Sequence, residues 1–217
     1  MQEKIAIDRR EVLRYLGYHG NEADERTMEL IEKAIGLLQE QARPAHIWRE
    51  FPLSLGAGGE IDGGCFQTVS RNLSRNLKDC ERLLLFAATL GLGVDYLIGR
   101  YTRLQMSMAV VLQAAGAAMI EAYCDKVCAG LKEDFLAEGW YVRPRFSPGY
   151  GDFSLECQRG ILGGLEAGKR IGITLTDSLL MMPSKSVSAV MGLGKKPWLC
   201  EVKGCEACGK KDCPYRR

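Results

Sequence analysis

A short stretch in the second half of the chain, from Arg143 to Asp152, limits the possible folds more than any other segment. Pro144 and Pro148 each fix a backbone φ angle and remove an N–H donor, so the stretch is neither a helix interior nor a central strand. Gly149 and Gly151 allow the backbone to turn sharply or to approach a ligand closely. The sequence therefore predicts a well-defined loop that the neighbouring elements must accommodate.

The same loop carries polar side chains suited to binding. Arg145 supplies a forked cation, Tyr150 a flat ring with a hydroxyl, and Asp152 a carboxylate. A rigid loop with such groups is a common way for a scaffold to present a binding site. An ordinary turn rich in proline and glycine, with its polar groups in water, explains these residues equally well.

Size and composition indicate one soluble globular unit. The 217 residues are enough for one sizeable core, whereas two complete domains would be cramped. Hydrophobic residues make up 47% of the chain and charged residues 26%, as in soluble globular proteins. The net charge of +2 favours no class of partner. The sequence shows no basic stripe interleaved with aromatic residues, which argues against nucleic-acid binding.

The sequence gives no indication of export or of membrane insertion. The segment from Met1 to Arg10 is charged and lacks the apolar region of a secretory signal. The longest apolar run, Met106 to Ile120, is interrupted by Ser107 and Gln113 and is too short to cross a bilayer. We therefore expect a cytoplasmic protein whose nine cysteines are thiols or metal ligands rather than disulfides.

The order of predicted elements indicates the α+β class, because helices and strands are mixed without regular alternation. Asn21 is a plausible N-cap of the second helix, and Pro52 favours an edge position for the first strand. The glycines between Gly56 and Gly59 lack the ending of a phosphate-binding loop and predict a surface turn. Helices are predicted over residues 8–17, 21–43, 70–77, 94–101, 104–136 and 155–167, and strands over 46–55, 82–90, 140–145, 171–175, 178–182 and 187–191.

Three ordered motifs resemble one known family. Arg145-Phe146-Ser147-Pro148-Gly149-Tyr150 resembles the Arg-x-x-x-Gly-Tyr motif of the S-adenosylmethionine-binding reactivation (activation) domain of cobalamin-dependent methionine synthase. The chain is most similar to the stand-alone form of that domain. Two further stretches resemble other signatures of the family: Ile120-Glu121-Ala122-Tyr123 upstream, and Leu175-Thr176-Asp177-Ser178 with Met182-Pro183-Ser184-Lys185-Ser186-Val187-Ser188 downstream.

The resemblance implies a fold and a ligand. The fold is a twisted antiparallel sheet with packed helices, and the ligand is S-adenosylmethionine. Arg145 matches the motif arginine and can hold a carboxylate with two parallel hydrogen bonds. Ser147 matches a position whose backbone touches the ligand, and Tyr150 matches the motif tyrosine, which packs on the ligand or faces the corrin of a partner. Tyr150 as a simple loop anchor remains an alternative.

The resemblance also implies acidic residues for the cationic parts of the ligand. Glu121 fits the acidic position on the long helix best, with Asp125 in reserve, because a carboxylate attracts the ammonium and sulfonium groups. An ion pair of Glu121 with Lys126 or Arg145 explains the same residue. A second acidic residue, expected near the N-terminal end, has no clear match, since Asp8 and the region from Glu22 to Glu25 compete.

Other conspicuous residues receive structural interpretations. Arg143 is expected to be a solvated charge at a strand end. Asp177 and Ser178, with Ser186 and Ser188, are expected to shape turns around Pro183. His19 and His46 lie far from one another in sequence and predict no catalytic dyad. Cys124 and Cys128, one helical turn apart, are expected to be core thiols.

The C-terminal segment forms a separate region, so we expect an α+β domain over residues 1–194 and a basic, cysteine-rich tail over 195–217. Cys200, Cys205, Cys208 and Cys213 follow the spacing Cys-x4-Cys-x2-Cys-x4-Cys. Four thiolates so close together could bind zinc or an iron–sulfur cluster. A reduced tail without metal explains the same cysteines.

The resemblance implies a reactivation role. The chain would bind S-adenosylmethionine and act with a separate cobalamin-bearing methionine synthase core, with flavodoxin or ferredoxin as electron donor. It has no Asp-x-His-x-x-Gly motif to supply a cobalt ligand, so cobalamin is expected on the partner. The alternatives are a client from another corrinoid pathway, or a non-catalytic metal-binding or interaction module that uses the cysteine tail.

Overall fold

A four-stranded antiparallel sheet forms the centre of the protein. The computed structural model describes residues 4–18 and 23–197. The strand order is β1 (Ala45–Pro52), β5 (Arg82–Thr89), β9 (Ser186–Gly194) and β6 (Tyr141–Val142). β5 is the continuous apolar run of the sequence and is buried from its second residue onward, so it lies at the centre. β1 lies at an edge of the sheet, as Pro52 predicted.

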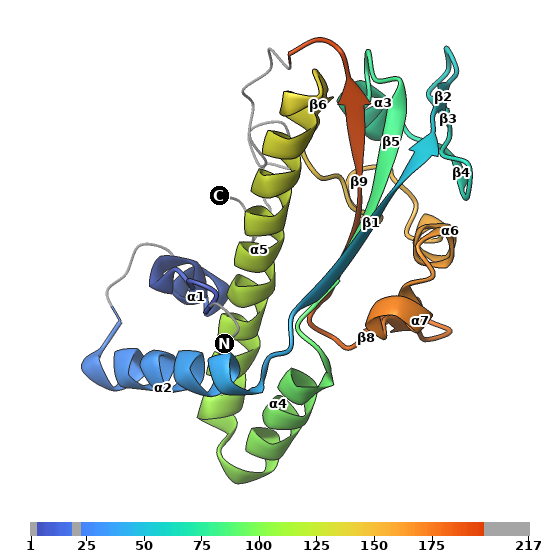
Figure 1. The fold of residues 1–217 in the computed structure, drawn as a ribbon. Helices are drawn as coiled ribbons and strands as arrows, with labels where there is room; N and C mark the ends of the chain where they lie inside the picture. The colour runs from blue at the N-terminus through green and yellow to red at the C-terminus, as the bar shows by residue number, and fades with distance from the viewer. Residues whose placement is uncertain (1–3, 19–22, 198–217) are drawn as a thin grey trace.

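Two hydrophobic cores lie on opposite faces of the sheet, because alternate residues of β5 point to opposite sides. Leu84, Phe86 and Ala88 belong to one core, and Leu83, Leu85 and Ala87 belong to the other. This mixture of helices with antiparallel strands confirms the predicted α+β class. The first core is covered by α1 (Arg9–Tyr15), α2 (Glu25–Gln41), α4 (Leu92–Leu104) and α5 (Met106–Ala137), and the second by α3 (Arg71–Asn76), α6 (Cys157–Gly164) and α7 (Ala167–Ile171) (Figure 1).

Two small sheets complete the second layer. β2 (Ser54–Leu55), β3 (Glu60–Asp62) and β4 (Gln67–Val69) form one antiparallel sheet. β7 (Thr174–Leu175) and β8 (Met181–Met182) form the other and lead directly into β9. The predicted surface turn joins β2 to β3, which confirms that the glycine cluster is a hairpin connection.

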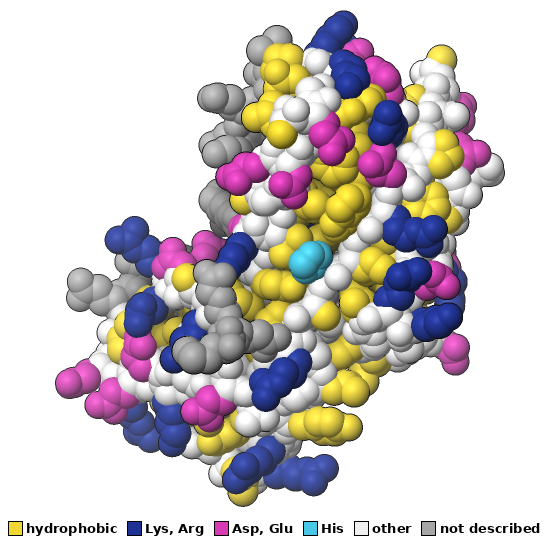
Figure 2. Space-filling view, in the orientation of Figure 1, with side chains coloured by type: hydrophobic (Ala, Val, Ile, Leu, Met, Phe, Trp, Pro, Cys, Tyr) yellow, Lys and Arg dark blue, Asp and Glu magenta, His cyan; other side chains and the backbone are white. Residues whose placement is uncertain are grey.

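The long helix α5 runs beside the whole sheet. Its length and composition would allow it to cross a membrane, but 61% of its most apolar window is buried inside the protein. It packs against α1, α2 and α4 and is the central helix of the first core. Hydrophobic side chains fill the space between α5 and β1 (Figure 2), where the rings of Trp48 and Phe135 meet edge to face.

The structure corrects four predicted boundaries. Asp24 rather than Asn21 caps α2, by accepting a hydrogen bond from the Thr27 N–H at 2.7 Å. The helix predicted over 155–167 ends at Gly164, because Glu166 adopts a left-handed conformation with φ of 53°, and α7 then begins. Ile171, expected in a strand, ends α7. The strand predicted over 140–145 is regular only in β6.

Candidate functional site

One edge of β9 is only partly covered. β6 pairs with Leu193 and Gly194, and Phe146 forms an isolated bridge with Val190. Within the part of the chain that the structure describes, no strand pairs with this edge between Ser186 and Ala189. The Val190 N–H and C=O bond to Phe146 at 2.9 Å each, and alternate residues of an antiparallel strand point the same way. The backbone groups of Ser188 therefore point toward this unpaired edge, where Ser188 is 3% exposed.

The proline-glycine loop begins where β9 is bridged by Phe146. Beyond the bridge, the Gly149 N–H donates to the Phe153 carbonyl at 2.8 Å, and the Tyr150 N–H donates to the Ser147 carbonyl at 3.3 Å. Gly149 and Gly151 have φ of 91° and 57°, conformations that favour glycine. The loop is thus a defined turn fixed to the sheet, as the sequence predicted.

Asp152 holds the loop to α3. Its carboxylate accepts hydrogen bonds from the Ser70 hydroxyl, the Arg71 N–H at 2.8 Å and the Asn72 N–H at 3.1 Å. The bond from Ser70 and the two backbone N–H bonds lower the pKa of Asp152. Asp152 therefore caps α3 from outside the helix, which gives this loop carboxylate a structural role.

We expect Asp152→Asn to destabilise the protein at neutral pH by about 1 kcal/mol, because the charged cap is weakened. The pKa of Asp152 is lowered in the folded state, so its contribution is full above the unfolded pKa near 4. This contribution disappears as the pH falls through the lower folded pKa. The difference in unfolding free energy between the wild type and Asp152→Asn, measured with urea, should therefore be smaller at pH 3 than at pH 7. An equal difference at both pH values, or an equal loss in the exposed control Asp134→Asn, would contradict this role.

Arg145 and Glu121 come together as an ion pair, although they lie on different elements. Nη2 of Arg145 is 3.1 Å from the Glu121 carboxylate and 2.6 Å from the Asp125 carboxylate, one turn further along α5. The Arg145 side chain is only 17% exposed, whereas those of Glu121 and Asp125 are 33% and 64% exposed. Burial alone would lower the pKa of Arg145, but the neighbouring groups on α5 outweigh it and raise that pKa.

This ion pair leaves hydrogen-bond donors of Arg145 and negative charge on α5 available for a ligand. Nε and Nη1 of Arg145 make no hydrogen bond with any described residue, so their N–H groups can donate to a ligand. Glu121 and Asp125 carry two negative charges against the single charge of Arg145. The cluster therefore offers one cationic and one anionic surface to the same region of solvent.

The other two loop residues occupy different positions. Ser147 is half-buried, and its carbonyl is used by the turn. Tyr150 is 69% exposed at the tip of the loop, where its ring is accessible to a ligand or to a partner.

Arg143 is buried, which corrects the prediction of a solvated charge. It is 2% exposed, and its guanidinium donates to the carbonyls of Lys196 at 3.2 Å and Lys78 at 3.4 Å. It links β6 to the chain after α3 and after β9, so its role is structural. The candidate N-terminal acids Asp8 and Asp24 likewise serve as N-caps, of α1 and α2.

A second polar cluster, which motif matching did not assign, lies at the other end of the open edge. Lys185, immediately before β9, donates to the Gln113 side-chain oxygen of α5 at 2.7 Å. The neighbouring Ser184 binds Asp95 of α4 through its N–H at 2.9 Å and through its hydroxyl. The only sequence sign of this cluster is a lysine within the Ser-Val-Ser signature.

His46 and the helix cysteines have structural roles in the folded protein. His46 is satisfied by a 2.8 Å hydrogen bond with the Tyr123 hydroxyl. Cys124 and Cys128 are buried core thiols, and burial raises the pKa of Cys124 to about 12. Residues 4–18 and 23–197 contain no cluster of three potential metal ligands. Cys200, Cys205, Cys208 and Cys213 lie outside the described residues, so a metal site there stays a prediction.

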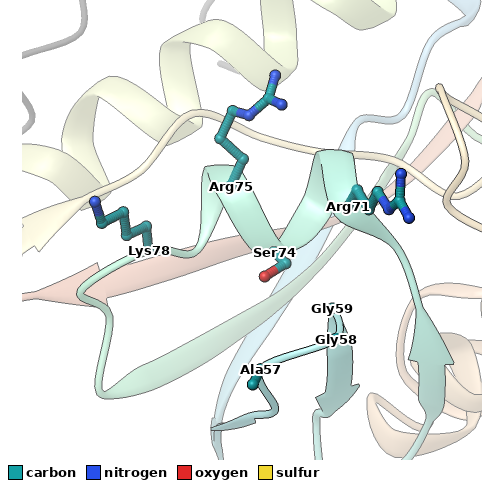
Figure 3. Close-up of a pocket in the computed structure, with 7 residues that line it drawn as sticks. All are labelled: Ala57, Gly58, Gly59, Arg71, Ser74, Arg75 and Lys78. Atoms are coloured by element: carbon teal, nitrogen blue, oxygen red, sulfur yellow. The ribbon is translucent and has the colours of Figure 1, made fainter.

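An open depression of about 470 Å³ lies between α3 and the β2–β3 turn. Its basic residues Arg71, Arg75 and Lys78 extend outward from α3 and do not converge, while Ser74 faces the glycines (Figure 3). The N–H of Gly58 is already bonded to the carboxylate of Glu60 at 2.8 Å. The depression therefore lacks the convergent donors of a phosphate site.

Comparison with known proteins agrees with the motif resemblance. Residues 75–198 match the family model described as the vitamin B12 dependent methionine synthase activation domain. The fold is similar to a crystal structure of the MetH reactivation domain bound to AdoHcy, with a TM-score of 0.59 and 19% identity. The match covers 77% of this chain and 64% of that one, and no curated protein matches. The family match spans more than half of the sequence, and the chain belongs to the activation-domain family of vitamin B12-dependent methionine synthase.

Proposed function

We propose that this chain binds S-adenosylmethionine beside the open edge of β9 and positions its methyl group for a cobalamin held by a separate methionine synthase core. The proposal rests on family membership and on one feature of the site, the cluster of Arg145, Glu121 and Asp125. The similar reactivation domain was crystallised with AdoHcy, a ligand of the same chemical class.

The charges of the cluster match those of the ligand. The carboxylate of S-adenosylmethionine would accept hydrogen bonds from the Nε and Nη1 groups of Arg145, since charge-assisted hydrogen bonds to a carboxylate are strong. The ammonium and sulfonium groups are cationic and would lie toward Glu121 and Asp125. An amino acid end with both signs of charge thus fits a cluster with both signs of charge.

The contribution of the protein to the reaction is positioning. S-adenosylmethionine would supply the methyl group and leave as S-adenosylhomocysteine, and an electron donor such as flavodoxin or ferredoxin would supply the one electron needed to return the partner's cob(II)alamin to methylcobalamin. The residues at the β9 edge bind and orient the donor, and none of them is required to move a proton. Holding reactants in the correct geometry is itself a large source of rate. Tyr150 at the exposed tip of the loop would face the ligand or the corrin.

We also propose the limits of the ligand-binding domain, its client and its location. Residues 1–194 form the ligand-binding domain, and the basic tail from 195 onward is a separate region. The client is the cobalamin-bearing core of methionine synthase, and the site of action is the cytoplasm. A client from another corrinoid pathway is the outcome to expect if the methionine synthase core gives no response in the following assay.

A reconstituted reactivation assay tests the proposal. A methionine synthase core that carries cob(II)alamin but lacks an activation domain is mixed with S-adenosylmethionine and reduced flavodoxin, with and without this chain. We expect the absorption spectrum of methylcobalamin to appear faster when the chain is present. The same rate without the chain, for this core and for other corrinoid proteins, would contradict the proposal.

We expect Glu121→Gln to reduce the preference for S-adenosylmethionine over S-adenosylhomocysteine. S-adenosylmethionine carries a methyl group and a positive charge on sulfur that S-adenosylhomocysteine lacks. Removing a nearby negative charge should therefore weaken the binding of S-adenosylmethionine more than that of S-adenosylhomocysteine. A several-fold fall in the affinity ratio, measured by calorimetry, is the expected result. Asp134→Asn, near the end of α5, is the matched control. An unchanged ratio in a folded Glu121→Gln protein would place the sulfonium elsewhere.

A further inference from the structure

Lys185 occupies a fixed position at the end of the β9 edge opposite Arg145. Its carbonyl accepts a hydrogen bond from the Leu90 N–H at 2.9 Å, which ties it to the end of β5. Its side chain crosses α5 at Gly116, where a Cβ atom would lie 3.1 Å from the lysine Cε. The ammonium then reaches the side-chain oxygen of Gln113. The absence of a side chain at Gly116 therefore allows this lysine to lie flat against the helix.

The ammonium of Lys185 is half-buried but makes no ion pair with any described residue. Burial lowers its pKa, and the charge of Asp95 acts in the opposite direction without direct contact. An ammonium has three donors, and the neutral oxygen of Gln113 uses one of them. Partly buried lysines without a carboxylate partner are uncommon, so the remaining donors are available for another acceptor.

The Arg145 cluster and the Lys185 cluster lie at the two ends of a strip whose length and polarity suit S-adenosylmethionine. Gln113 and Glu121 are roughly two turns apart on α5, about 12 Å along its axis. The part of β9 that has no strand partner on this edge among the described residues, around the buried Ser188, lies between the two ends. A ligand with its amino acid end at Arg145 and Glu121 would extend along this strip. Its sulfonium would then lie far from Lys185, which avoids repulsion between two positive charges.

From these observations we propose that Lys185, oriented by Gln113, binds the nucleoside end of S-adenosylmethionine. The hydroxyls of the ribose and the ring nitrogens of adenine are acceptors that an ammonium can bind. This inference rests on the proposed function, because it assigns the second end of the same ligand. It makes Lys185 a binding residue and Gln113 a positioning residue.

The test compares a whole ligand with a truncated one. 5′-Methylthioadenosine retains the nucleoside but lacks the amino acid carboxylate and ammonium. We expect Lys185→Met to weaken the binding of S-adenosylmethionine and of 5′-methylthioadenosine by a similar factor, about tenfold, since a hydrogen bond from a charged donor is lost. Arg145→Ala should weaken the binding of S-adenosylmethionine but not that of 5′-methylthioadenosine. Lys185→Arg should restore part of the affinity for both ligands.

The outcomes separate this inference from the proposed function. Thermal unfolding of each variant shows whether it is folded, and Lys185→Gln replaces Lys185→Met if the latter is not. Wild-type affinity in a folded Lys185→Met protein, or a variant with reduced stability and normal binding, would overturn the inference alone. So would a wild-type protein that binds S-adenosylmethionine but not the truncated ligand. A wild-type protein that binds neither ligand would overturn the proposed function together with the inference.

Discussion

Arg145→Ala is expected to weaken S-adenosylmethionine binding by a factor of at least about ten, because a charge-assisted hydrogen bond contributes about 1.5–3 kcal/mol. The Arg145 guanidinium forms ion pairs with both Glu121 and Asp125, and its Nε and Nη1 groups make no hydrogen bond with any described residue. Arg145→Lys keeps the charge but loses the planar fork, so its affinity should lie between those of the wild type and the alanine variant. Calorimetric titration of the three proteins measures the series.

The control for this series is Arg75→Ala, an exposed arginine that lines the depression on α3. It should leave the affinity unchanged. Arg145→Ala should remain folded, with a loss of about 1 kcal/mol, because Glu121 and Asp125 are partly exposed and keep contact with water. Equal affinity in a folded Arg145→Ala protein would remove this residue from the site.

The second large effect concerns stability and a pair of glycines in α6. A Cβ atom at Gly160 would lie 2.3 Å from the backbone oxygen of Cys65 and 3.0 Å from the Cβ of Phe66. A Cβ atom at Gly163, one turn further on, would have no neighbour within 4 Å. We expect Gly160→Ala to destabilise the protein by about 2–3 kcal/mol, since a backbone must move in a packed layer. Gly163→Ala should be neutral or stabilise by up to about 1 kcal/mol, as alanine favours a helix.

Urea unfolding of the two alanine variants and the wild type gives the comparison. The matched pair separates the steric effect from helix propensity, because both substitutions are glycine to alanine in the same helix. A loss for both variants, or for neither, would show that α6 does not pack against the segment before β4 as the structure places it.

Much of the fold could be predicted from local sequence. The apolar run of β5 predicted a buried strand, Pro52 predicted an edge strand, and small residues predicted a packed α5. The break after Gly164 could not be predicted, because the left-handed residue there is Glu166 rather than glycine. The pairing of β9 with β5 and β6 could not be predicted either, because it joins segments that are far apart in the chain.

The candidate site was partly predictable for a similar reason. The motif resemblance singled out Arg145 and Glu121, and the structure shows that they meet. Arg143 was misjudged because charged residues are usually exposed, and only tertiary structure reveals the carbonyls that its guanidinium binds. Asp152 was grouped with the binding residues because its partner α3 is distant in sequence. Lys185 was left unassigned because its partner Gln113 lies on another element.

Calorimetric titration of S-adenosylmethionine into the reduced wild-type protein tests the central claim most directly. We expect saturable binding of one ligand per chain, with an affinity that is at least about tenfold weaker in Arg145→Ala and unchanged in Arg75→Ala. The titration is repeated in the presence of a cobalamin-loaded methionine synthase core, which would complete a site shared between the two proteins. No saturable binding in either titration would contradict the account.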